Sequence, residues 1–406
     1  MAADAPAADL VRPRLGGPAA VLILISGSHA VIHAYTAVMP LIYPLALVDL
    51  HFSLTALGVM VASSNLVGGL LQLGAGALTR RLRRHTIIGW GAVLLGLSGI
   101  GTALAATFAQ FFAMNIVGRA ATSAQHPLGN SLLSDVYARS RRGMAIAGHV
   151  AGGNVGTLLA PVAGVVVVAW GWRQALLLLT IPAIAAGVAI LAGMSEAAGP
   201  PRERTVWRDM LAAARLLRRR NLALVFAAGV IGAGGRGLGI VTLIVPLFLK
   251  QQLRLPTAEV NILYGIVLVG SVIGTFAVGP ISDRFGRRRT LLLSYALSVP
   301  VTLGLLGVHG PSPWLLLLMA GLGLIVYGES PLLQTFVADE APIAERDALF
   351  SLYFAVAFGV GSIWAAGMGI ALERLGYGPV FVIMAVSYVA AGLCIALTRD
   401  APRSGR

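Results

Sequence analysis

Long apolar runs alternate with short charged segments along almost the whole of this chain. Each run holds about 20 or more mainly apolar residues, the length that an α-helix needs to cross about 30 Å of hydrocarbon at about 1.5 Å per residue. Twelve such runs can be counted. The pattern predicts an all-α membrane protein whose twelve transmembrane helices cover residues 19–48, 54–79, 86–107, 109–136, 143–169, 174–195, 221–249, 258–282, 290–308, 313–338, 348–372 and 377–398.

Positive charge is distributed unevenly between the segments that join these runs. Of the 30 Lys and Arg residues, 24 fall in the two termini and the alternate loops that share their side, whereas 4 fall on the other side. Because basic segments stay in the cytoplasm, both termini are predicted to be cytoplasmic, in a bacterial inner membrane. Topology thus accounts for the net charge of +14, and no nucleic-acid partner is expected.

The remaining composition fits the same interpretation. Hydrophobic residues make up 57% of the chain and charged residues 11%, whereas a soluble domain has about 25% charged residues. The first 18 residues contain prolines and acids rather than the short apolar core of a secretory signal peptide, so the first run is expected to act as the insertion signal. A lone cysteine, Cys394, excludes an intramolecular disulfide and a cysteine-based metal site.

A polar segment at 196–220 divides the twelve runs into two sets of six. It contains two prolines and seven arginines. Its second half could lie as a helix on the anionic inner leaflet, but a flexible tether is the preferred interpretation. The expected organisation is a cytoplasmic tail at 1–18, a first bundle at 19–195, the basic linker at 196–220, a second bundle at 221–398 and a cytoplasmic tail at 399–406.

The two halves repeat each other at a constant offset of 204 residues. The repeated residues lie in the fourth run of each half and in the loop after it: Pro127, Leu128, Asp135 and Arg142 recur as Pro331, Leu332, Asp339 and Arg346. This repeat predicts two pseudo-symmetric six-helix bundles with the transport pathway between them.

One cytoplasmic loop carries a family signature. The sequence GPISDRFGRRR at 279–289, between the eighth and ninth runs, resembles the loop signature of the major facilitator superfamily. The corresponding loop of the first half, GALTRRLRRH at 76–85, departs from it, with Arg80 in place of the acid and Arg83 in place of the glycine. The resemblance implies a monomeric secondary transporter that exposes a central site alternately to the two sides of the membrane.

Within the superfamily, parts of the first half resemble fosmidomycin-resistance-type efflux proteins. The resembling stretches are SAQHP at 123–127, GGNVGT at 152–157 and AP at 160–161. The fifth run also resembles the antiporter motif, with Gly156, Pro161 and Gly164 in place. It departs from that motif at Ala160, which replaces a glycine. The resemblance implies efflux coupled to protons.

Three ionisable residues fall deep within apolar runs, where a charge is costly without a partner or a cavity. Glu329, about 15 Å from the cytoplasmic end of its run at about 1.5 Å per residue, suits a carboxyl group that gains and loses a proton during transport. Its alternative role is as a structural partner of a buried arginine. Arg119 occupies the place of the family's fourth-helix arginine, which the resemblance associates with proton transfer. Arg236, among glycines, can bind an anionic substrate or pair statically with Glu329.

His29 and His33 lie four residues apart, so they share one helical face. That spacing can bind zinc, but the neighbouring sequence offers no third ligand, so neither a metal nor another cofactor is expected. The pair is expected to line a substrate cavity or to form helix-packing hydrogen bonds. Further candidates for the substrate site are Gln125, His126, His149, Asn154 and Tyr327.

Acids at the cytoplasmic ends of the runs are candidates for gating. The resemblance implies that Asp283 caps a neighbouring helix and, with Arg287 in the same signature, belongs to the closed cytoplasmic gate. The alternative is ordinary solvated charge. Related inter-helix pairs are expected between Asp135 and Arg142 and between Asp339 and Arg346.

The chain contains no nucleotide-binding P-loop and no Ser/His/Asp set, so an enzyme or an ATP-driven pump is not expected. The predicted function is export of a small organic compound across the lipid bilayer in exchange for protons. Uptake of a small organic anion with protons is the first alternative, favoured by the two buried arginines. A membrane sensor that transports nothing is the second.

Overall fold

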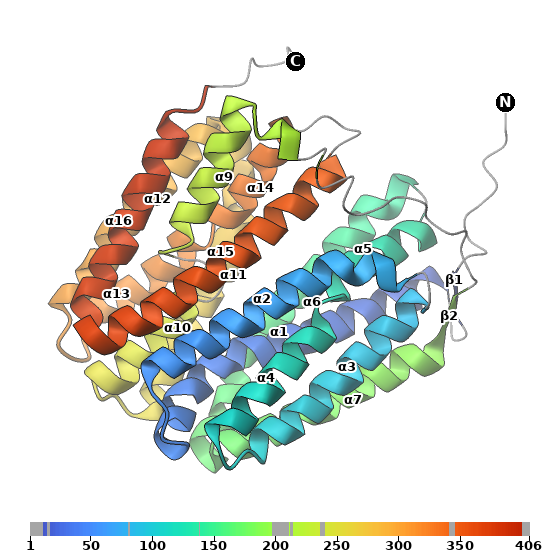
Figure 1. Ribbon diagram of the computed structural model, residues 1–406, viewed down its shortest axis with the longest axis horizontal. Coiled ribbons are helices and arrows are strands. Elements are labelled where there is room, and N and C mark those ends of the chain that lie inside the picture. Colours follow the sequence, from blue (N-terminus) through green and yellow to red (C-terminus); the bar gives the residue numbers. More distant parts are fainter. Residues whose placement is uncertain are drawn as a thin grey trace. The chain divides into compact units, whose positions relative to one another are not determined.

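The computed structural model describes residues 11–13, 17–79, 82–137, 139–196, 211, 214–235, 240–340 and 346–399. Within these residues the chain is almost entirely helical (Figure 1). It divides into two compact units, Met1–His51 with Val67–Arg204, and Phe52–Leu66 with Thr205–Arg406.

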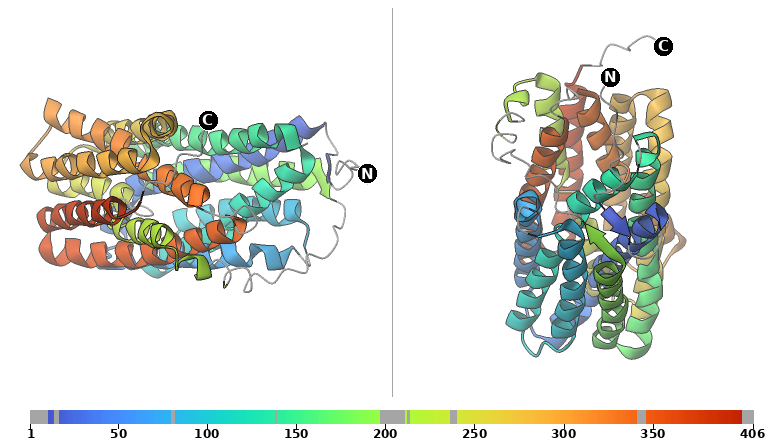
Figure 2. Two further views of the ribbon diagram at one scale, coloured as in Figure 1. Left: turned by 90° about the horizontal axis from the view of Figure 1, so that it is seen from above. Right: turned by 90° about the vertical axis from the view of Figure 1, so that its right-hand side faces the viewer.

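The first unit is a bundle in which α3 and α7 lie side by side, as do α1 and α6 (Figure 1, Figure 2). The second half of α2 (Leu54–Leu78) belongs to this unit, and its first half belongs to the other unit. The remaining elements of the first unit are β1 (Val11–Pro13), α1 (Pro18–Asp49), α3 (Arg84–Ala103), α4 (Phe108–Thr122), α5 (Gln125–Val136), α6 (Arg139–Trp170), α7 (Trp172–Gly193) and β2 (Met194–Glu196).

The second unit is also a helical bundle, in which α12 and α16 pack together and the first half of α2 packs against α15 at Gly58 and Gly369. Its other elements are α9 (Arg220–Gly232), α10 (Ile240–Leu247), the π-helix η3 (Phe248–Gln252), α11 (Thr257–Phe285), α12 (Arg287–Leu303), the 3-10 helix η4 (Gly304–Gly307), α13 (Pro313–Gly321), the π-helix η5 (Leu322–Val326), α14 (Glu329–Glu340), α15 (Arg346–Leu375) and α16 (Tyr377–Ala396).

Ten helical segments of the described residues are long and apolar enough to cross a membrane. The expected single helices at 109–136, 221–249 and 313–338 are each interrupted. The first is divided into α4 and α5, the second into α9, α10 and η3, and the third into α13, η5 and α14. Pro127 explains the first break, because it has no N–H to donate to the carbonyl of Ser123, four residues earlier, and so cannot continue the helix of α4. Glycine, a poor helix former, explains the end of α9 at Gly232.

The internal repeat extends to the ends of helices. α5 and α14 each contain 12 residues, and their first residues, Gln125 and Glu329, are separated by the repeat offset of 204. Pro127 and Pro331 stand third in these helices, where a missing N–H leaves no helical hydrogen bond unmade. The proline therefore places an equivalent helix start in the fourth run of each half.

Glycines on α6 let it approach the α1 backbone closely. A Cβ added at Gly152 would lie 2.8 Å from the carbonyl oxygen of Ser26, and one at Gly156 would lie 2.6 Å from the carbonyl carbon of Ala30. Small residues at such spacing bring helix backbones together in membranes. This close packing places α6 against the face of α1 that carries the histidines.

A short two-stranded sheet, which the sequence pattern did not predict, joins β1 to β2. The strands are antiparallel, with Val11 opposite Glu196 and Pro13 opposite Met194. The sheet fixes the chain at the end of α7, so that Glu196 lies against the start of α3.

Candidate functional site

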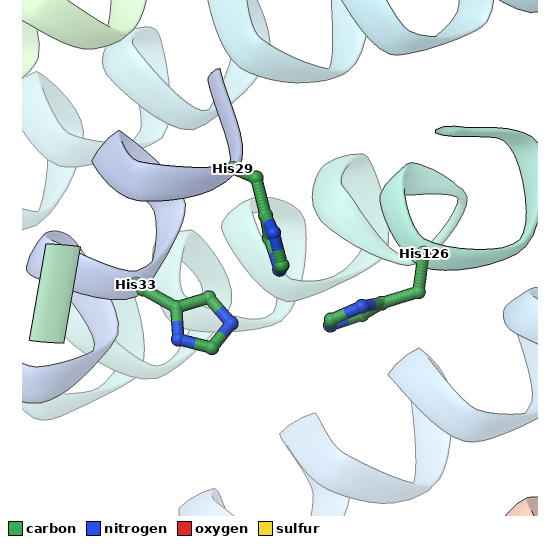
Figure 3. A group of neighbouring side chains, drawn as sticks. All are labelled: His29, His33 and His126. Atoms are coloured by element: carbon green, nitrogen blue, oxygen red, sulfur yellow. The ribbon is translucent and has the colours of Figure 1, made fainter. Parts of the chain in front are cut away.

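Three histidines from two helices converge in the first unit (Figure 3). His29 and His33 lie one turn apart on α1, and His126 lies near the start of α5. The ring centroid of His29 lies 4.4 Å from that of His33 and 4.6 Å from that of His126. One ring nitrogen from each residue can be chosen so that all three lie within 4.8 Å of one another. The structure thus supplies, through His126, the third residue that the sequence near His29 and His33 does not offer.

Hydrogen bonds from α6 fix the orientation of the two α1 rings. His29 Nδ1 lies 2.9 Å from the backbone oxygen of His149, and His33 Nδ1 lies 3.2 Å from Thr157 Oγ1. A carbonyl only accepts, so His29 donates from Nδ1. Thr157 donates its own hydroxyl proton to the Gly153 carbonyl at 3.2 Å, so its oxygen accepts from His33 Nδ1. In both rings Nε2 therefore carries the free lone pair.

Other predicted polar residues surround the cluster to different degrees. The ring of His149 is fully buried and stacks on His29 with a centroid distance of 4.2 Å. Gln125 donates from Nε2 to the backbone oxygen of Ile25 at 3.1 Å, which ties the start of α5 to α1. Asn154 is half-buried on α6 and Tyr327 is half-buried at the end of η5, in the other unit.

Arg119 extends from α4 toward this cluster. A Cβ added at Gly68 would lie 2.9 Å from Arg119 Nε, so the side chain packs against the α2 backbone. Its guanidinium acts electrostatically on His33 and His126. This part of the first unit therefore combines the positive charge of Arg119 with imidazole nitrogens that can donate or accept hydrogen bonds.

Glu329 is a buried acid of the second unit, with 2% of its surface exposed. Its Oε1 accepts a hydrogen bond from Tyr295 Oη at 2.6 Å. A Cβ added at Gly232 would lie 2.7 Å from the same oxygen, so only glycine leaves room for the carboxylate there. Glu329 also lies in the first turn of α14, where the helix dipole favours negative charge. Arg236, its predicted partner, lies outside the described residues.

Equivalent ion pairs lie at one end of each unit. Arg84 at the start of α3 contacts Asp135 at 2.6 Å, and Arg287 at the start of α12 contacts Asp339 at 3.4 Å. The side chains of the other predicted gating residues, Asp283, Arg142 and Arg346, lie outside the described part of the structure.

Arg84 and Glu196 are site residues that sequence reasoning missed. Arg84 is shared by Asp135 and Glu196. The signal for Arg84 was its place at the start of the third run, which matches that of Arg287. Glu196 gave no comparable signal, because it reaches Arg84 only through the sheet between β1 and β2.

The Glu196 pair predicts a pH dependence of stability. Burial alone would raise the pKa of Glu196, but hydrogen bonds from His85 and Arg84 and the Arg84 charge hold this pKa below its usual value. The pair therefore stabilises the fold above a pH of about 4.3, the ordinary value for Glu, and this contribution is lost as the pH falls through the lowered pKa. We expect Glu196→Gln to lower the free energy of unfolding by about 1–3 kcal/mol at neutral pH. The variant should also lose less stability than the wild type as the pH falls.

Thermal unfolding in detergent between about pH 3 and pH 7 measures this effect, since that range brackets the ordinary pKa of Glu. Glu259→Gln is the control, because the Glu259 side chain is exposed at the start of α11. If the stability of Glu196→Gln fell as steeply with decreasing pH as that of the wild type, the assignment would be contradicted.

Comparisons with known proteins agree with this architecture. The family model described as Major Facilitator Superfamily matches residues 24–366 and 236–406. The uncharacterized MFS-type transporter YfnC of Bacillus subtilis (strain 168) is 23% identical over 386 residues, which cover 94% of this chain and 93% of that protein. The chromaffin granule amine transporter of Rattus norvegicus is 24% identical over 350 residues, covering 83% of this chain and 65% of the relative.

Solved structures show the same fold. The crystal structure of the nucleoside transporter NupG has a TM-score of 0.76 at 16% identity and covers 93% of this chain and 98% of its own. A bacterial homologue of the human lysosomal transporter Spinster, in an inward-facing and unoccupied conformation, has a TM-score of 0.71 at 14% identity, with 93% and 94% of the two chains covered. Transporters of this fold carry small molecules and are generally not enzymes. The chain belongs to the Major Facilitator Superfamily and is a multi-pass membrane transporter.

Proposed function

We propose that this transporter exports a small organic compound in exchange for protons and that Glu329 is the carboxyl group that carries the proton. The observation that supports this most directly is the buried pair of Glu329 and Tyr295. A buried carboxyl group is costly in a membrane protein unless it serves the transport cycle or a fixed partner.

Tyr295 suits both protonation states of Glu329. A phenolic hydroxyl can donate to a carboxylate oxygen and can accept from a protonated carboxyl group. The 2.6 Å contact can therefore persist when the proton arrives or leaves. A group that must change charge at every cycle gains from a partner that accommodates both states.

The first unit is proposed to contribute most of the polar contacts to the substrate. Arg119 keeps its charge at every physiological pH, and the histidines beside it offer both donors and acceptors. This combination suits a compound with polar or anionic groups. The second predicted arginine, Arg236, is proposed to act on the same substrate.

A flux assay tests the proposal. The whole protein, in liposomes with a pH-sensitive dye inside, is exposed to a panel of amines, nucleosides, sugars, carboxylates and phosphonates under an imposed pH difference. Proton-coupled export predicts proton movement opposite to that of one of these compounds. Movement of both in the same direction would favour anion symport, and movement of the compound without protons would contradict the coupling.

We further propose that both termini are cytoplasmic and that the ion pairs of Arg84 and Arg287, together with Asp283, close the cytoplasmic side. In a Cys394→Ser background, Arg83→Cys and Arg215→Cys are then expected to react with a membrane-impermeant maleimide only when the reagent reaches the inner face. Intact cells and inverted vesicles give the two measurements. Labelling of either position in intact cells would contradict the topology.

A further inference from the structure

We propose that His29, His33 and His126 form a binding site for a divalent transition-metal ion of the zinc type. The site lies in the first unit and does not rest on the proton-coupling role given to Glu329. It is assigned from the convergence of the three rings (Figure 3) and from the hydrogen bonds that orient two of them.

The hydrogen bonds leave the ligand atoms available. His29 Nε2 is buried and has no hydrogen-bond partner within the described part of the structure, while its Nδ1 donates to the His149 carbonyl. His33 is held in the same way by Thr157. Metal-binding histidines almost always donate their second ring N–H to a carbonyl or a similar acceptor, which orients the lone pair toward the ion. Both α1 histidines have this arrangement.

The spacing of the nitrogens fits a small adjustment on binding. Zinc holds imidazole nitrogens at about 2.0–2.1 Å, and a tetrahedral arrangement then separates them by about 3.4 Å. One nitrogen from each of the three rings lies within 4.8 Å of the other two, so a rotation that brings each inward by about 1 Å completes the site. His126 has an exposed side chain, which provides an entry path for the ion. His29 is only 3% exposed, so the ion is shielded from solvent on that side.

The charge nearby determines what completes the coordination. Three histidines leave the fourth position of a tetrahedral ion open. Arg119 acts electrostatically on His33 and His126, so it repels a bare cation and favours an anionic donor in the open position. The expected occupant is therefore an ion held by three imidazoles with hydroxide, or another small anion, as its fourth ligand.

Zinc binding to the full-length protein tests the site. The protein is purified in detergent through a tag without histidine, and Zn²⁺ is titrated in competition with a fluorescent chelator. We expect one Zn²⁺ per chain and a loss of affinity of at least about 100-fold in His126→Gln, which exceeds the effect of about 10- to 100-fold typical of an outer-shell partner. His126→Asp, which keeps a ligand atom, is expected to retain part of the affinity.

Two further variants separate coordination from folding. His309→Gln is the control, because His309 is exposed in the loop before α13; its affinity should equal that of the wild type. Gly153→Ala removes no ligand, but its Cβ would lie 2.8 Å from His29 Cε1, so it should displace the ring and weaken binding. Thermal unfolding confirms that each variant is folded. Equal Zn²⁺ affinity in the wild type and a folded His126→Gln protein would overturn the proposal, as would an absence of Zn²⁺ binding by the wild type.

Discussion

Replacing Glu329 with Gln is expected to abolish proton-driven transport while leaving a folded protein that still exchanges its substrate across the membrane. The Gln side chain matches the shape of a protonated Glu and keeps an oxygen that can accept from Tyr295 Oη. It cannot release a proton, so the chain behaves as if permanently protonated at this position. Substrate counterflow in liposomes should persist, whereas accumulation driven by a pH difference should fall to background.

A static role for Glu329 makes a different forecast. If the acid neutralised a buried arginine, Glu329→Gln would leave that charge stranded at a cost of about 3–5 kcal/mol, and the protein would unfold more easily. Glu340→Gln is a matched control, because Glu340 lies at the other end of α14 and bonds to Asn221. Normal pH-driven transport by a well-folded Glu329→Gln protein would remove Glu329 from the coupling mechanism.

The second large effect is expected in the first unit, where Gly156→Ala should weaken the packing of α6 on α1. The added Cβ would overlap the carbonyl group of Ala30, with 2.6 Å to its carbon. The added Cβ is fixed to the backbone of α6 and the carbonyl group belongs to the backbone of α1, so neither can move without its helix. Overpacking commonly costs about 1–3 kcal/mol, and a backbone overlap should lie at or above the upper end of that range.

Gly148→Ala on the same helix is the control for this change. Its Cβ would lie 3.6 Å from Leu22 Cδ2, an ordinary contact. Because alanine is the better helix former by about 1 kcal/mol, this variant should be as stable as the wild type or more so. The thermal unfolding midpoints of the two variants in detergent give the comparison. Equal midpoints would show that the packing of α6 on α1 does not require a glycine at position 156.

Sequence reasoning predicted most of the helices because the length of an apolar run is a local property. It failed at 109–136, 221–249 and 313–338, where prolines or a group of glycines interrupt the backbone without changing the hydropathy. The repeat of Pro127 and Pro331 held the information needed for the first break.

The histidine cluster shows a different limit. His29 and His33 could be paired from their spacing on one helix, because that geometry is local. His126 joins them only through the packing of α5 on α1, and His149 through the packing of α6, which the glycines permit. Likewise, Arg84 could be inferred from its match with Arg287, but Glu196 required the unpredicted sheet. Contacts between distant segments therefore made up the part of the site that the sequence did not reveal.

The equivalent starts of α5 and α14 bear on proton stoichiometry under the proposed mechanism. The repeat places Gln125 in one half where Glu329 stands in the other. A side-chain amide does not change its protonation state at physiological pH, whereas a carboxyl group can. These duplicated positions therefore carry at most one proton per transport cycle, and any larger ratio of protons to substrate would have to draw on residues outside this pair.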